Sequence, residues 1–351
     1  MNQIKEIPRV NNFDIIRLLA AFQVVYMHSM NHLKIEGSVA VFYERFLQYF
    51  PGVPIFFTVS GFLIFWAYDR NPDLKKYIVN RLLRLYPALY VCLAITIGLL
   101  VTFSSISLLS NTSFYVWLVG QVSIFQFYTP EILRFWGVGT PNGALWTIAV
   151  EVQFYIVVPL FFLLMRKVRG SVLLTILFII SVLANFYLAG LPQTTIQKLS
   201  FVSIIPYLFN FLIGSVFYIY WDKLNFLVKN KFWRWLIVYA LYIVILGHVM
   251  GHELHAYQLI NFYQFLATIL LSIFTLSFAF SFNSLSDKLL RHNDISYGIY
   301  IYHMLVVNTF VSLGLIADSK YFLATFITTI VLAFLSWKLI EKPALSLKKR
   351  F

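Results

Sequence analysis

Four ionisable side chains fall inside stretches of sequence that are otherwise apolar: Arg17, His28, Glu151 and His303. On insertion scales an ionisable group at the centre of a membrane helix costs about 2.5–3.5 kcal/mol, so each one is a candidate for function. A histidine titrates near neutral pH and can take a proton from a hydroxyl, and a carboxylate can orient that imidazole. These residue types therefore indicate the activation of a hydroxyl as a nucleophile.

Arg17 and His28 are separated by eleven residues, which is almost a whole number of helical turns. Both side chains therefore share one face of a predicted helix, about 16 Å apart along its axis. This face carries an anion-binding group near its predicted cytoplasmic end and a titratable group near its outer end. The alternative is that Arg17 extends to the lipid headgroups and His28 is an interfacial histidine.

Glu151 lies in the segment LWTIAVEVQFY, residues 145–155, at a predicted depth similar to that of His28. A lone carboxylate in hydrocarbon is protonated or paired, so His28 is its expected partner. We therefore predict His28 and Glu151 as the catalytic pair. The alternative is a structural hydrogen bond between helices.

His303 follows the segment ISYGIYIY, in which Tyr300 lies three residues earlier and shares a helix face with it. Together with Tyr297, these side chains predict a polar cavity near the middle of a span. The alternative is a packed helix whose hydroxyl groups bond to neighbouring backbone.

Two further groups of side chains lie outside the predicted spans or at their ends. Arg81 and Arg84 could bind phosphates on the cytoplasmic side, although positive charge collects there in any membrane protein. His248, His252 and His255 have helical spacing and could ligate zinc, but they do not match the H-E-x-x-H pattern of metalloproteases. We predict no metal site.

The elements that must position these residues are membrane helices. The chain has 351 residues, of which 60% are hydrophobic and only 12% are charged, against about 25% charged in soluble domains. Apolar runs of about 20 residues have the length that a helix needs to cross the hydrocarbon core of a bilayer. We predict an all-α, polytopic membrane protein that forms a single membrane-embedded domain over 1–351, with no appended soluble domain. Its ten expected spans are 12–31, 51–68, 83–104, 144–165, 171–190, 203–221, 232–249, 259–281, 295–316 and 320–340.

The distribution of Lys and Arg predicts that both termini are cytoplasmic. With ten spans, 21 of the 27 basic residues fall inside, 5 fall outside and Arg17 lies within a span. This asymmetry argues against an eleventh span at 112–128, a segment that could instead lie at the interface or re-enter the membrane. It also explains the net charge of +13 as topology, so no nucleic-acid partner is expected.

Six segments resemble, in order, the motifs of the acyltransferase-3 family of bacterial membrane proteins. Residues 14–28 are similar to its R-x10-H signature with a preceding Asp, and residues 295–303 to its I-S-Y-x-I-Y-x-x-H motif. The other similar segments are GVPIFFTVSGFLI at 52–64, RLLRLYP at 81–87, LWTIAVEVQFY at 145–155 and EKP at 341–343.

The resemblance implies an O-acyltransferase of the bacterial plasma (inner) membrane. Its donor would be cytoplasmic acyl-CoA, with acetyl-CoA expected, and no cofactor would be tightly bound. The acceptor would be a hydroxyl of a cell-surface glycan or of its lipid-linked precursor. The implied roles are His28 as base, Glu151 in the site, Arg17, Arg81 and Arg84 at the donor, and Asp14, Ser60, Tyr297, Tyr300 and His303 as supporting or acceptor-site residues.

Two observations keep alternatives open. Pro54 stands where many relatives have an acid, and Ile15 and Ile16 replace a step that often contains glycine, so the subfamily and the acceptor are undefined. The second functional class is a transporter that exports a polysaccharide, because buried charges also mark a substrate path. A cluster of cytoplasmic arginines favours the acyltransferase, since an exporter of glycans needs no phosphate-binding site.

The charge asymmetry yields a topology that labelling can test. In a variant without Cys92, a cysteine placed in loop 250–258 should react with a membrane-impermeant thiol reagent added to intact cells. A cysteine in 222–231 should not react, because this segment is predicted to be cytoplasmic. The reverse pattern would contradict the predicted topology.

Overall fold

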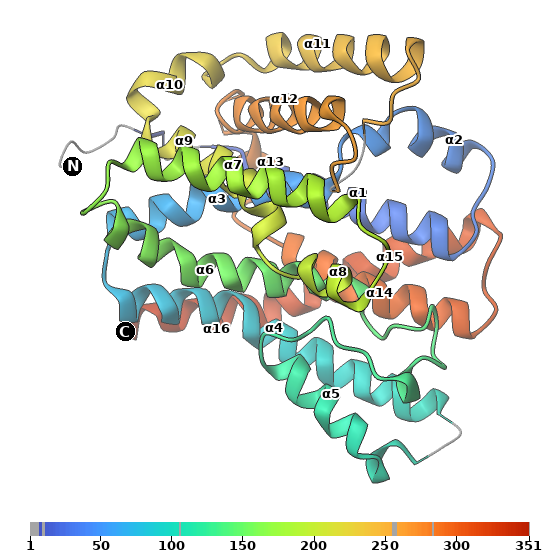
Figure 1. The fold of residues 1–351 in the computed structure, drawn as a ribbon. Helices are drawn as coiled ribbons and strands as arrows, with labels where there is room; N and C mark the ends of the chain where they lie inside the picture. The colour runs from blue at the N-terminus through green and yellow to red at the C-terminus, as the bar shows by residue number, and fades with distance from the viewer. Residues whose placement is uncertain (1–6, 9–10, 105–106, 255–257, 283, 351) are drawn as a thin grey trace. The chain divides into compact units, whose positions relative to one another are not determined.

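A computed structural model describes residues 7–8, 11–104, 107–254, 258–282 and 284–350. Every regular element within these ranges is a helix, and none is a strand (Figure 1). The all-helical, multi-pass fold class predicted from the apolar runs is confirmed.

The chain forms two compact units, unit 1 and unit 2, which alternate along the sequence. Unit 1 contains the residues up to 20 together with 49–73 and 153–293, and unit 2 contains 21–48, 74–152 and the residues from 294 onward. Two helices, α1 (Phe13–His32) and α6 (Trp146–Leu164), contribute residues to both units.

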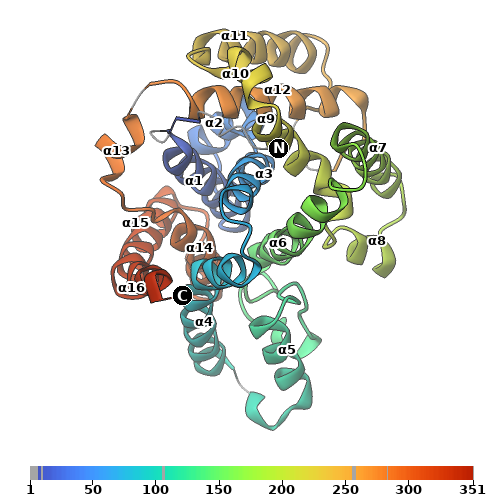
Figure 2. The same cartoon turned by 90° about the vertical axis from the view of Figure 1, so that its left-hand side faces the viewer.

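Unit 1 is built around close packing of α3 (Gly52–Arg70) against α9 (Leu208–Ile219). A Cβ atom on Gly61 would overlap the backbone carbonyl of Phe211, and one on Gly214 would overlap that of Thr58. Small residues allow membrane helices to approach in this way. Figures 1 and 2 both show α11 alongside α12. Unit 1 also contains α7 (Gly170–Ala189), α8 (Thr195–Ser200), η5 (Ile205–Tyr207), α10 (Trp221–Val228), α11 (Phe232–Tyr242) with the π-helical η6 (Ile243–Val249), α12 (Phe262–Ala279) and α13 (Leu285–Leu290).

Unit 2 is built around α14 (Ser296–Ser312), which packs against α4 (Leu74–Phe103) and α15 (Ser319–Ser336). The first thirteen residues of α14 are all buried, which makes this helix the core of the unit. Unit 2 also contains α2 (Ser38–Arg45), η2 (Leu108–Ser110), α5 (Thr112–Val122), η3 (Glu131–Leu133), η4 (Gly143–Leu145), the π-helical η7 (Trp337–Glu341), α16 (Lys342–Ser346) and η8 (Leu347–Arg350).

By length and apolar composition, seven helices in the described ranges could cross a membrane, or eight if one bent pair counts as a single span. They correspond to eight of the ten predicted spans. The other two predicted spans, 12–31 and 295–316, correspond to α1 and α14, which carry polar residues in their interiors; α14 also has only 17 residues. The number of ten and the cytoplasmic placement of the termini stay predictions, and Met1 and Phe351 lie outside the described residues.

The exposed faces of several helices are apolar. On α7, the side chains of Ile176, Ile179, Ile180 and Leu183 are each at least half exposed. Contiguous apolar surface of this kind is typical of contact with lipid. By contrast, α5 has 11 residues and is therefore about 16 Å long, too short to cross a hydrocarbon core of about 30 Å. Segment 112–128 therefore does not supply an eleventh helical span.

Candidate active site

The N-terminal end of α14 is fixed by Asp294. Its carboxylate accepts hydrogen bonds from the backbone N–H of Ser296 at 3.2 Å and from the Ser296 hydroxyl. An acidic side chain at a helix start satisfies donors that have no partner within the helix, and it interacts favourably with the helix dipole. Asp294 therefore sets where α14 begins.

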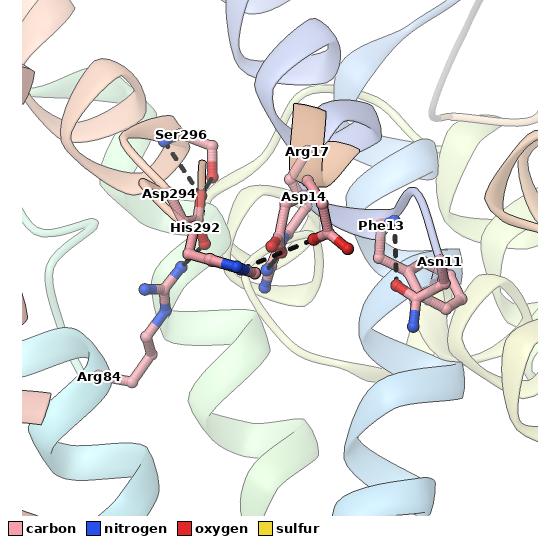
Figure 3. Close-up of polar contacts among 9 residues, drawn as sticks. Asn11, Phe13, Asp14, Arg17, Arg84, His292, Asp294 and Ser296 are labelled. Carbon is pink, nitrogen blue, oxygen red and sulfur yellow. Dashed lines mark hydrogen bonds and ion pairs between the residues drawn. The ribbon is translucent and has the colours of Figure 1, made fainter. Parts of the chain in front are cut away.

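The same carboxylate forms an ion pair with Arg84 of α4 (Figure 3). Both side chains are largely buried, with 16% of Arg84 and 10% of Asp294 exposed. One turn earlier on α4, the guanidinium of Arg81 lies 5.9 Å from the centre of the Tyr77 ring. Two arginines on the same side of α4 therefore lie near the start of α14.

A third cation approaches these arginines from the C-terminal segment. Lys348 lies in η8, which packs against α4. Its burial, together with repulsion from Arg81 and Arg84, lowers the pKa of Lys348 to about 8. Burial and nearby positive charge both disfavour the protonated amine. The acid Glu341 is also buried nearby, and it accepts a hydrogen bond from the Ser336 hydroxyl at 3.1 Å.

Further along α14, two imidazole rings form a hydrogen-bonded pair. Nδ1 of His28 lies 2.7 Å from Nε2 of His303. The rings are nearly parallel, at 15°, with their centres 5.1 Å apart. His303 is completely buried, whereas His28 is partly accessible. On its other side, Nδ1 of His303 lies 2.7 Å from the carbonyl oxygen of Tyr300. The ring of His28 is thus held in place by its contact with α14.

The tyrosines of α14 bind neighbouring backbone. The Tyr297 hydroxyl donates to the carbonyl of Leu85 at 3.0 Å. The Tyr300 hydroxyl lies 2.6 Å from Thr147 Oγ1 and 3.1 Å from the carbonyl of Ala144. These bonds hold α14 against α4, η4 and α6. A role of Tyr297 and Tyr300 at the acceptor stays a prediction.

Comparison with known proteins identifies the family of this chain. The model of the acyltransferase-3 family, described as an acyltransferase domain, matches residues 10–338. This chain belongs to that family. The similarity predicted from the six motifs is thereby confirmed, and the protein is an acyltransferase.

Its relatives include named O-acetyltransferases. Nodulation protein 10 of Rhizobium leguminosarum bv. viciae is 30% identical over 350 residues, which cover 96% of this chain and 94% of that protein. The O-acetyl transferase of Shigella phage Sf6 is 24% identical over 96% of each chain. Peptidoglycan O-acetyltransferase OatA of Listeria monocytogenes is 30% identical over 174 residues, which cover 45% of this chain and 25% of that protein. No solved structure is significantly similar to the chain.

The acyltransferase brings together only some of the residues that the sequence singled out. His28, Tyr300 and His303 converge, and Arg81 and Arg84 lie near each other on α4. The ring partner of His28 is His303, whereas the sequence suggested Glu151. Glu151 is partly buried in α6, and its role stays a prediction.

The remaining predicted residues lie in unit 1 of the acyltransferase. Arg17 forms an ion pair with Asp14, three residues earlier on α1 (Figure 3). Ser60 is partly buried within α3. Their roles at the donor and in support of the site stay predictions.

The alternative zinc site also falls in unit 1. The His248 ring packs edge-on against Tyr49, with ring centres 5.4 Å apart. The His252 ring stacks on Tyr263 at 4.0 Å. Tyrosine contacts of this kind are sufficient to explain two of the three histidines, and His255 lies outside the described residues.

Sequence reasoning missed three residues of the acyltransferase site. Asp294 directly precedes the I-S-Y motif, and its position just before a helix was a usable signal for a cap. Lys348 was counted only as topological charge. Asn142, which donates to the carbonyl of Ile301 at 2.8 Å and thereby ties the loop before α6 to α14, has no local signal.

The ion pair between Arg84 and Asp294 should be important for stability. Asp294→Ala removes one partner of a buried pair, a change that typically costs about 3–5 kcal/mol. We expect a marked fall in the unfolding temperature of the purified protein in detergent.

Asp318→Ala is the matched control, because Asp318 also caps a helix and pairs with a base, Lys320, but on the surface. Its unfolding temperature should change much less. Equal shifts for the two variants would show that burial of the Arg84 pair does not matter.

Proposed function

We propose that this acyltransferase moves an acyl group, expected to be acetyl, from cytoplasmic acyl-CoA to a hydroxyl of a cell-surface glycan or of its lipid-linked precursor. The proposed location is the bacterial plasma (inner) membrane. The observation that carries the proposal is the placement of two kinds of group along α14. A cation cluster lies at its start, and an imidazole pair lies about 10 Å further along, at seven residues and 1.5 Å per residue.

The cation cluster suits the donor. Coenzyme A carries phosphate groups, and guanidinium groups bind phosphates through paired, charge-assisted hydrogen bonds. Arg81, Arg84 and Lys348 come from two segments far apart in sequence and lie in one unit. The topology predicted from charge places this end of α14 in the cytoplasm, where acyl-CoA is found. Arg17 remains a further candidate for donor binding.

The imidazole pair suits the chemistry. In the proposed step, His28 takes the proton of the acceptor hydroxyl as its oxygen attacks the thioester carbonyl carbon. The new carbon–oxygen bond forms, the carbon–sulfur bond breaks, and the departing thiolate takes the proton back from His28. The products are an ester and coenzyme A. A positioned base contributes about 10²–10⁴-fold to such a step.

The acceptor class is supported by the relatives. OatA of Listeria monocytogenes is named for O-acetylation of peptidoglycan, a cell-surface glycan. His28 is a partly accessible residue near the predicted outer end of α1, where a glycan on the outer side would arrive. The particular sugar and hydroxyl are to be identified by mass spectrometry of surface glycans from cells with and without the protein.

Donor binding should depend on pH through Lys348. Because the pKa of Lys348 in the free protein is lowered to about 8, its positive charge is lost as the pH rises through about 8. Bound phosphate favours the charged form, so the affinity for acetyl-CoA should be full below about pH 8 and should fall above it. Titration calorimetry of the purified protein between about pH 6 and about pH 9.5, a range of about 3.5 units that includes this pKa, measures the effect.

Two substitutions sharpen this test. Lys348→Met should weaken acetyl-CoA binding about tenfold and abolish the pH dependence, and Arg81→Ala should weaken binding by a similar factor. Lys288→Met, which changes an exposed lysine of α13, is the control and should bind normally. Unchanged acetyl-CoA binding in the Lys348 and Arg81 variants would show that these residues do not bind the donor and only reflect the positive charge that collects on the cytoplasmic side.

His28 should be essential for transfer. His28→Ala should lower the transfer of label from [14C]acetyl-CoA to the native glycan by at least about 10²-fold in membrane vesicles, while acetyl-CoA still binds. If Glu151 acts in the same step, Glu151→Gln should also abolish transfer, and the double variant should be scarcely worse than either single one. A normally produced His28→Ala variant that still acylates its glycan would overturn the proposed mechanism.

A further inference from the structure

The geometry points to His303 as the positioning residue that holds His28 in one tautomer, with Nε2 of His28 as the proton acceptor. This inference rests on the proposed function of His28 as the base. It assigns the orienting role to a neutral imidazole on α14, and it names the atom of His28 that reacts.

The first step of the argument is fixed by a backbone carbonyl. The oxygen of Tyr300, 2.7 Å from Nδ1 of His303, can only accept a hydrogen bond. Nδ1 of His303 must therefore carry a proton. In a neutral imidazole, the other nitrogen is then an acceptor, so Nε2 of His303 presents a lone pair.

The second step follows from the contact between the two rings. Nδ1 of His28 lies 2.7 Å from Nε2 of His303, which presents a lone pair, so Nδ1 of His28 must be the donor. The proton of neutral His28 is thereby placed on Nδ1, and Nε2 of His28 is left with a free lone pair. Only this nitrogen can then act as a general base.

The buried surroundings of His303 restrict its protonation state and its tautomer. Its side chain is completely buried, and its neighbours Tyr302 and Met304 on α14 are buried as well. A doubly protonated ring would place a positive charge at this completely buried position, which is costly. Rotation of the ring would break its bond to Tyr300. The fold therefore sets the tautomer of His303, and the hydrogen bond between the two rings then sets the tautomer of His28.

The arrangement also accounts for the fate of the proton. When Nε2 of His28 takes the proton of the hydroxyl, the ring becomes a cation while Nδ1 still donates to His303. That hydrogen bond becomes charge-assisted and stronger, which stabilises the state formed during the reaction. The proton later leaves from the same Nε2 to the thiolate, so no proton has to pass through His303.

Two amide substitutions distinguish a role of His303 in orienting the His28 ring from a role in stability alone. In His303→Gln, the amide oxygen reaches the place of Nε2 and can still accept from His28. In His303→Asn, the shorter side chain places its amide near the position of Nδ1 and cannot reach His28. We expect the Gln variant to retain kcat within about tenfold and the Asn variant to lose about 10²–10⁴-fold, with KM for acetyl-CoA unchanged in both.

The measurement is the initial rate of label transfer from [14C]acetyl-CoA to the native glycan in membrane vesicles, with the amount of folded protein determined in parallel. The matched control is Thr309→Val, which removes another side-chain hydrogen bond of α14, that of the Thr309 hydroxyl to the carbonyl of Leu305 at 2.8 Å. Its kcat should equal that of the unmodified protein. If the Asn variant does not fold, His303→Leu takes its place as the variant without an acceptor.

Two outcomes would overturn the assignment of His303. One is a folded Asn or Leu variant as active as Thr309→Val. The other is a folded Gln variant as inactive as the Asn variant, because an acceptor at the place of Nε2 would then be insufficient. Activity in His28→Ala would instead overturn the proposed function itself, so the two failures can be told apart.

Discussion

The burial of α14 is the constraint on which the rest of unit 2 depends. In a buried environment of low polarity, each polar atom without a hydrogen bond destabilises the fold. The buried helix α14 nevertheless carries tyrosines, a histidine and an asparagine. These side chains are accommodated because each finds a partner on a neighbouring segment: Tyr297 on α4, Tyr300 on η4 and α6, and Asn308 on the loop at 140–141. Together these bonds fix the rotation of α14 about its axis.

The fixed rotation connects the two ends of the candidate site. α4 accepts from α14 at the carbonyls of Leu85 and Ala88, and the Cys92 thiol bonds back to the carbonyl of Ile301. Arg84 directly precedes Leu85 on α4. Arg81, Arg84 and His303 therefore lie on one pair of packed helices, and Lys348 and His28 reach them from η8 and α1.

Both units combine small residues with side-chain hydrogen bonds. In unit 1, Gly61 and Gly214 allow α3 and α9 to approach until backbones touch, and Thr58 Oγ1 lies 2.9 Å from Ser272 Oγ of α12. In unit 2, Gly298 of α14 packs closely against Ala333 of α15, and the side-chain hydrogen bonds of α14 specify its orientation. The imidazole pair lies in unit 2 and depends on that orientation.

The sequence by itself determined the class of the protein and identified candidate functional residues. Long apolar runs specify membrane helices because the bilayer core admits no unpaired backbone, and the cost of burying charge drew attention to His28, Glu151 and His303. Seven of the ten predicted spans match helices that are long and apolar enough to cross, an eighth matches a bent helix pair, and α1 and α14 stand where the other two were placed. Helical periodicity also gave the shared face of Tyr300 and His303.

Only the tertiary structure decided which helices meet. His28 and His303 are 275 residues apart, and Arg84 and Asp294 are 210 apart. Periodicity tells which side of a helix a residue occupies, but not which other helix faces that side, since any apolar face can pack against many others. The partner of His28 was therefore expected to be a carboxylate and is an imidazole, and the contribution of Lys348 depends on a C-terminal segment that folds back onto α4.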